Sequence, residues 1–169
     1  MKPAHTVDPS VLAEELRRAL RGHGQFVDPL RAVDALDWKL AGRTPPGFDH
    51  SALQLLAHMV YWQDRYLARL AGEDAPTPPH DAEGWPGPAA PSSEREWLDA
   101  VDAFRRGLAA ADAAVGAAPL GDTGPTLAGK TRLGTLNGLA LHNGYHAGQL
   151  AQLRKVLGAW PPPGGGDSW

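Results

Sequence analysis

The sequence predicts an all-α protein built as a helix bundle. Four long segments contain no proline, and each is long enough for a helix of ordinary length. None of them alternates apolar and polar residues with the period of two that is typical of a half-buried strand. Residues that commonly cap helices stand before these segments or near their starts. The proline-free segments are Val11–Val27, Asp49–Ala75, Ser92–Ala118 and Thr126–Trp160.

The first helix is predicted to begin at Asp8-Pro9, with Asp8 as the N-cap and Pro9 as the first helical residue. A leucine every fourth residue then gives the helix one apolar face. These leucines are Leu12, Leu16 and Leu20. Gly22 ends the pattern, and a shorter helical segment is predicted over Asp28–Leu40.

The next two helices have clear start signals. Ser51 can cap a helix that continues to about Leu70 and ends at Gly72. Ser93 and Glu96 match the Ser-x-x-Glu capping box, in which each residue bonds to the backbone N–H of the other. Both helices are therefore predicted from their caps as well as from their composition.

Thr131 is the predicted cap of the last helix, which ends near Gly158. Two interpretations of the proline-rich segment Pro76–Pro91 remain open: a surface linker, or a lid in which Trp85 packs against the bundle. We expect one domain over residues 1–160, and a disordered tail over residues 161–169.

Composition narrows the classes of function. The 169 residues include sixteen Lys and Arg against nineteen Asp and Glu, so the net charge of −3 argues against nucleic-acid binding through bulk charge. The absence of cysteine excludes disulfides, Cys-ligated metals and a Cys nucleophile. The sequence shows neither a signal-peptide pattern nor an apolar run long enough for a membrane span, so we expect a cytoplasmic protein without a membrane partner.

Three of the seven histidines form a candidate metal site. His142 and His146 lie four residues apart on the predicted last helix, about 40° apart around its axis. That spacing alone is weak support, because chance produces such pairs. His58 is in register with the apolar residues of its own helix, so it faces the core. Each could be an ordinary buried histidine, but three on two neighbouring helices favour a metal.

A site with three imidazole ligands suits zinc, nickel, iron or copper and leaves positions open for water or substrate. The His-x-x-x-His spacing matches that of zinc peptidases, but Asn143 stands where their catalytic Glu would be. Peptide hydrolysis by that mechanism is therefore disfavoured.

The last helix also carries a stripe of small residues on the side away from the two histidines. The stripe consists of Ala140, Gly144, Ala147, Gly148 and Ala151. Small residues permit close approach of another helix, since each helical glycine otherwise costs about 1 kcal/mol relative to alanine. The partner could be a helix of the same chain or, in a homodimer, of a second copy.

Two segments carry a family resemblance: LALHNGYHAGQLAQLRKVLGAW in the predicted last helix, and GFDHSALQLLAHMVYWQDRYL around His58. They are similar to the closing helix and the second helix, respectively, of the DinB/YfiT-like metalloenzyme family. The resemblance implies an up-down-down-up four-helix bundle with a metal at one end, bound by His58, His142 and His146. One departure is Asp49-His50-Ser51-Ala52, where the family often has Pro-His-Ser-Pro-Trp.

Two functions follow from the resemblance and the residues. One is a metal-dependent S-transferase or hydrolase of small molecules, with zinc or nickel, or else iron or manganese, as Lewis acid. Its thiol would be a low-molecular-weight cosubstrate, since the chain has no cysteine. The alternative is a non-catalytic metal-binding or ligand-binding stress protein. Residues that could orient a substrate, although packing or exposure would also explain each, are Asn143, Tyr145, Gln149 and Arg65.

Overall fold

The computed structural model describes residues 7–23 and 25–164, and within these ranges every named element of secondary structure is a helix. Two β-bridges, His23 with Phe26 and Thr123 with Thr131, are isolated. The prediction of an all-α protein is confirmed. The α-helices are α1 (Pro9–Leu20), α2 (Pro29–Val33), α3 (Trp38–Ala41), α4 (Ala52–Ala71), α5 (Glu94–Val115) and α6 (Arg132–Val156), and the 3-10 helices are η1 (Asp81–Gly84) and η2 (Pro125–Leu127).

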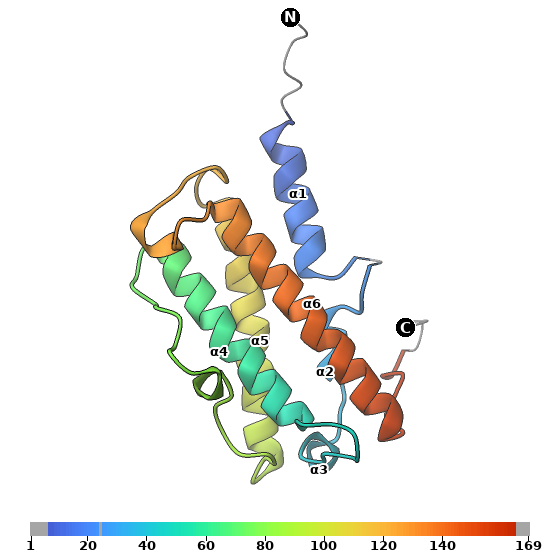
Figure 1. Ribbon diagram of the computed structural model, residues 1–169. Coiled ribbons are helices and arrows are strands. Elements are labelled where there is room, and N and C mark those ends of the chain that lie inside the picture. Colours follow the sequence, from blue (N-terminus) through green and yellow to red (C-terminus); the bar gives the residue numbers. More distant parts are fainter. Residues whose placement is uncertain (1–6, 24, 165–169) are drawn as a thin grey trace, which may run out of the picture.

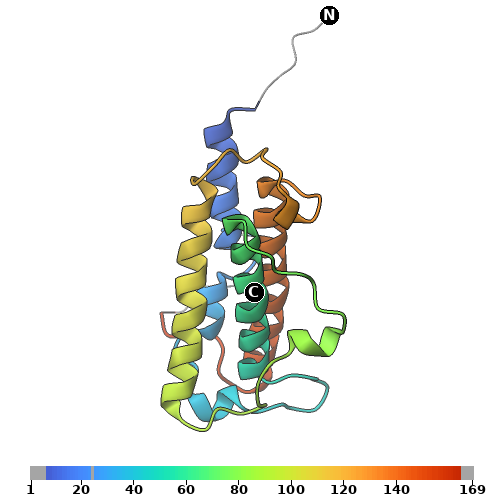
Figure 2. The same cartoon turned by 90° about the vertical axis from the view of Figure 1, so that its left-hand side faces the viewer.

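The four long helices lie side by side (Figure 1). Helix α4 packs against α5 and α6, and α1 packs against the same two helices. The short α2 contacts α6, whereas α3 contacts α4 and α5. The long segment between α4 and α5 carries η1 and passes beside α4 before α5 begins (Figure 2). This route brings a loop to the outer side of α4.

The caps predicted for the four long helices are present. Each capping side chain accepts a hydrogen bond from a backbone N–H of the first turn; the pairs are Asp8 with Ser10, Ser51 with Gln54, Ser93 with Glu96 and Thr131 with Gly134. The capping box predicted for α5 is wrong in one half. The Glu96 carboxylate accepts bonds from the backbone and hydroxyl of Ser92, both at 2.6 Å, so it does not bond to the Ser93 backbone. A reciprocal box occurs at α4 instead, between Ser51 and Gln54.

The single short helix predicted over residues 28–40 is also wrong, because the structure has two. Helix α2 ends before Asp34, and Ala35 adopts a left-handed conformation with φ of 48°. The Asp37 side chain then starts α3 by accepting a hydrogen bond from the Lys39 backbone at 2.9 Å. A new cap at Asp37 competes with continuation of α2, so the chain turns between the two helices.

Two clusters of buried apolar residues form the core. Members of the larger cluster include Met59, Phe104 and Leu150, and members of the smaller one include Leu16, Ala111 and Leu139. Along α4, Gln63 lies between them, fully buried, and donates a hydrogen bond to the Phe104 carbonyl at 3.2 Å. Gly107 on α5 leaves room for it, because a Cβ there would overlap the Gln63 amide. The core is therefore interrupted by a polar layer.

Four of the five residues in the small-residue stripe of α6 pack within the chain, whereas Gly148 has open space around it. Ala140, Ala147 and Ala151 are buried, and a Cβ on Gly144 would lie 2.7 Å from the Phe26 ring. An intrachain contact therefore explains these four residues. Homodimerisation stays a prediction, and the packed part of the stripe does not support it.

The chain continues past α6 to Trp160, which packs against the larger core cluster. Of the tail in which disorder is predicted, residues 165–169 lie outside the described residues. Among the residues that are described, no helix has the length and apolar character needed to cross a membrane.

Candidate metal centre

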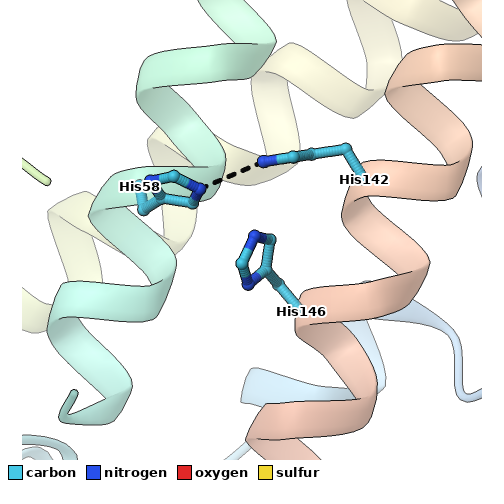
Figure 3. A group of neighbouring side chains, drawn as sticks. All are labelled: His58, His142 and His146. Carbon is cyan, nitrogen blue, oxygen red and sulfur yellow. Dashed lines mark hydrogen bonds between the residues drawn. The ribbon is translucent and has the colours of Figure 1, made fainter. Parts of the chain in front are cut away.

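The three predicted histidines meet between α4 and α6 (Figure 3). One ring nitrogen from each of His58, His142 and His146 lies within 4.8 Å of the other two. The shortest separation is 3.1 Å, between the Nε2 atoms of His58 and His142. The described residues contain one such group of potential ligands, and it could hold a metal ion.

Helix geometry explains this convergence. The i,i+4 spacing places His142 and His146 on one face of α6, with ring centroids 4.6 Å apart. His58 projects from the facing side of α4, and its ring centroid lies 4.6 Å from that of His146 and 5.0 Å from that of His142. Two packed helices therefore supply all three side chains.

Two of the imidazoles are oriented by a second group. His58 Nδ1 lies 2.6 Å from the Gly84 carbonyl oxygen, which can only accept, so Nδ1 carries the proton and donates. His146 Nδ1 lies 2.6 Å from Gln149 Oε1 and donates in the same way. Both bonds leave the Nε2 lone pair of the ring for a ligand. Metal-binding histidines have this arrangement in general.

His142 differs from the other two. Its Nδ1 atom is buried and has no hydrogen bond of ordinary geometry within the described chain. The adjacent Asn143 side chain is nevertheless close enough to raise the pKa of His142 slightly, against the larger opposing effect of burial. His142 is therefore the least firmly oriented of the three.

Burial keeps the triad neutral. The pKa of His142 is lowered from 6.5 to about 4, mainly by burial and also by the neighbouring His146 and His58. Burial also lowers the pKa of His146 to about 4, although the bond to Gln149 acts in the opposite direction. The pKa of His58 is lowered for the same main reason. Neutral imidazole is the form that binds metals.

Aromatic rings surround the triad. The indole of Trp85 is stacked between two imidazoles, with ring centroids 3.9 Å from His58 and 3.6 Å from His50. Trp62 contacts His58 and His142 edge to face, at 6.3 and 6.2 Å. Of the two interpretations of the proline-rich segment, this arrangement matches a lid that packs against the bundle.

The four residues expected to orient a substrate occupy different environments. Gln149 bonds to His146, and the Tyr145 ring lies 5.0 Å from the His146 ring while 67% of the residue is exposed. Asn143 is fully buried, and neither of its side-chain polar atoms has a partner in the described chain. Arg65 donates to the Pro76 carbonyl at 3.2 Å and stacks on Tyr61. The contacts of Gln149 and Tyr145 thus include the triad, whereas those of Arg65 do not.

Sequence reasoning missed three contributors to the site. Trp62 follows His58 by four residues, a helical spacing that could have identified it. His50 and Gly84 gave no comparable signal, because His50 acts through a loop tryptophan and Gly84 through its backbone carbonyl.

In a comparison with protein families, the model of the DinB superfamily matches residues 26–150. The matched region contains the triad and all of α2, α3, α4 and α5. A search of curated proteins and a search of solved structures each returned no match. The family model covers well over half of the 169 residues, so the chain belongs to the DinB superfamily.

Proposed function

We propose that this protein is a metal-dependent enzyme that acts on small molecules, with His58, His142 and His146 as ligands of one divalent ion. The observation that carries the proposal is the approach of three neutral imidazole nitrogens to within 4.8 Å of one another. The donor set contains no carboxylate or thiolate, which suits zinc or nickel and then iron. Manganese fits less well, because it favours oxygen ligands.

We further propose the up-down-down-up four-helix topology of one domain over residues 1–160. The course of the ribbon in Figure 1 supports it, since α4 and α5 run in the same direction and the intervening segment returns beside them. In this topology α4 and α6 are antiparallel neighbours. His58 on α4 can then face His142 and His146, which lie on successive turns of α6. That pairing supports a site made by two helices.

The chemistry follows from the charge of the ligands. A divalent ion held by three neutral imidazoles keeps its full charge and lowers the pKa of a coordinated water or thiol. The chain contributes orientation and shielding: Gly84 and Gln149 fix the rings of His58 and His146, and Trp85 covers one face of His58. A thiol would come from a low-molecular-weight cosubstrate, because the chain contains no cysteine.

Metal content tests the site directly. Protein purified without a His tag should contain about one divalent ion per chain by elemental analysis, and His58→Ala and His142→Ala should contain almost none. Equal metal in the three preparations would overturn the proposal.

The reaction is tested by depletion of an electrophile such as monochlorobimane. We expect metal-loaded protein to accelerate its reaction with bacillithiol, mycothiol or glutathione, and metal-stripped protein not to do so. A rate equal to the protein-free blank for all three thiols would instead favour a non-catalytic metal-binding or ligand-binding protein.

A further inference from the structure

A cavity of about 520 Å³ lies beside the triad, between the segment that precedes α4 and the outer face of α6. The segment contributes Phe48, Asp49 and His50, and α6 contributes Tyr145 and Gln149. The volume is sufficient for a small organic ligand. The three histidines of the triad are not among the lining residues, so the cavity is a separate space next to the centre.

The charge of the lining favours a cationic ligand. Asp49 lines the cavity, whereas no lysine or arginine does. Asp49 is exposed, and no ion pair between described residues uses its carboxylate. An unpaired carboxylate in a concave site attracts an ammonium group and repels an anion.

The other side chains fit the same ligand. Phe48 and Tyr145 bring aromatic rings to the lining, and aromatic faces attract organic cations. Gln149 and Gln152 add amide groups that can bond to a polar substituent, while Leu55 adds apolar surface. The combination of one carboxylate, two aromatic rings and a partly apolar wall matches an ammonium group attached to a hydrocarbon portion.

Two contacts connect this cavity with the triad. Gln149 holds His146 Nδ1 through its Oε1 atom, and its Nε2 atom donates to the Tyr145 hydroxyl at 3.4 Å. His50 stacks on Trp85, which stacks on His58. A ligand in the cavity would therefore contact residues that position two of the three histidines.

We propose that this cavity binds the organic-ammonium portion of the substrate, with Asp49 as the residue that determines specificity for the cation. The proposal rests on the proposed function in that it assigns the substrate class of the metal centre. The ligand is a primary or substituted amine with a small apolar group, protonated at neutral pH.

The test is a titration with benzylamine, benzyl alcohol and benzoate, which share a ring and differ in charge. Binding is followed by NMR through the side-chain amide signals of Gln149 and Gln152, in metal-loaded and metal-stripped protein. We expect benzylamine to bind at least about tenfold more tightly than the alcohol, a difference of about 1.4 kcal/mol, and benzoate to bind most weakly.

Asp49→Asn should remove most of the preference for benzylamine, whereas Asp74→Asn, which changes an exposed carboxylate outside the cavity, should leave it unchanged. Equal affinity for benzylamine and benzyl alcohol, or an unchanged preference in Asp49→Asn, would overturn the proposal. The proposed metal centre and the proposed ammonium site can fail separately. Selection of benzylamine by a protein that takes up no metal would contradict only the metal centre. A metal-loaded protein without this selectivity would contradict only the ammonium site.

Discussion

Helix α6 contains two regions of buried polar side chains that are built in opposite ways. Arg154, 1% exposed, bonds to the carbonyls of Ala159 and Ala32, each at 3.0 Å, and lies over the Trp160 ring. The triad, two to three turns earlier, directs nitrogen atoms at one another instead. The difference separates a structural role from a binding role: the donors of Arg154 are used by the fold, whereas the triad keeps nitrogen lone pairs for a ligand.

Arg132 resembles Arg154 and extends the comparison. Its guanidinium donates to the carbonyls of Leu70 and Ala114, at 2.9 and 3.0 Å, near the C-terminal ends of α4 and α5. Carbonyls at helix C-termini carry partial negative charge and lack intrahelical partners, so a buried cation can replace the solvent there. Backbone carbonyls therefore bind both arginines, and neither pairs with a carboxylate of the part of the chain that the structure describes.

The largest expected effect is the loss of metal on removal of a triad member. His58→Ala should weaken metal binding by at least about a hundredfold, because two imidazoles cannot complete the ligand set. The metal-free protein should not lose stability comparably. Competition with a chelator measures the affinity, and His80→Ala, at an exposed position, serves as the matched control. Tight metal binding by His58→Ala would show that the triad does not have the binding role that distinguishes it from Arg154.

Replacement of Arg154 should have the reverse effect of His58→Ala: it should lower stability and leave metal binding intact. Arg154→Leu leaves the buried carbonyl of Ala32 and the partly buried carbonyl of Ala159 without their donor, and we expect the free energy of unfolding to fall by about 3 kcal/mol. Folded Arg154→Leu should still bind metal with the same stoichiometry. Urea unfolding of the metal-free protein measures the loss.

A matched arginine variant provides the control for that measurement. Arg95 is 84% exposed in its side chain and pairs with Asp99 on the surface of α5. Arg95→Leu should cost less than about 1 kcal/mol, because exposed ion pairs contribute little. A similar cost for both arginines would contradict a structural role for the buried one.

A smaller effect is expected from the residue that orients His146. Gln149→Leu removes the acceptor for Nδ1 and should weaken metal binding by about tenfold, as loss of an outer partner does in metal sites generally. Gln152→Leu changes a neighbouring glutamine without a bond to the triad, and its affinity should match that of the unaltered protein. The absorption spectrum of bound Co²⁺ reports the coordination geometry independently. Identical affinities and spectra for both variants would rule out the orienting role of Gln149.

A separate effect is expected in the metal-free protein, whose stability should depend on pH. In the folded state the pKa values of His142 and His146 are about 4, below their ordinary value of 6.5, so the unfolded chain binds more protons between these limits. Stability should therefore fall as the pH falls from about 6.5 to about 4, and His142→Gln should reduce the slope. Thermal unfolding across this range gives the measurement, and a slope unchanged in His142→Gln would argue against depressed pKa values.

Much of the architecture was predictable from local sequence. The helix starts at Asp8, Ser51, Ser93 and Thr131 were correct, because an N-cap bonds to a backbone N–H within its own first turn. The convergence of His142 and His146 was equally predictable from the helical repeat. The errors occurred where two local signals compete, as in the segment over residues 28–40.

The sequence alone determined an all-helical chain and the three histidines that meet in it. Tertiary structure decided what surrounds them: the Gly84 carbonyl on His58, Trp85 between two imidazoles, the burial of Asn143 and the position of Arg65 away from the triad. The physical reason is the separation in sequence between the residues that interact. Caps and helical periodicity act over three or four residues, whereas these contacts depend on how the 22-residue segment between α4 and α5 passes beside α4 and how closely α6 packs within the chain.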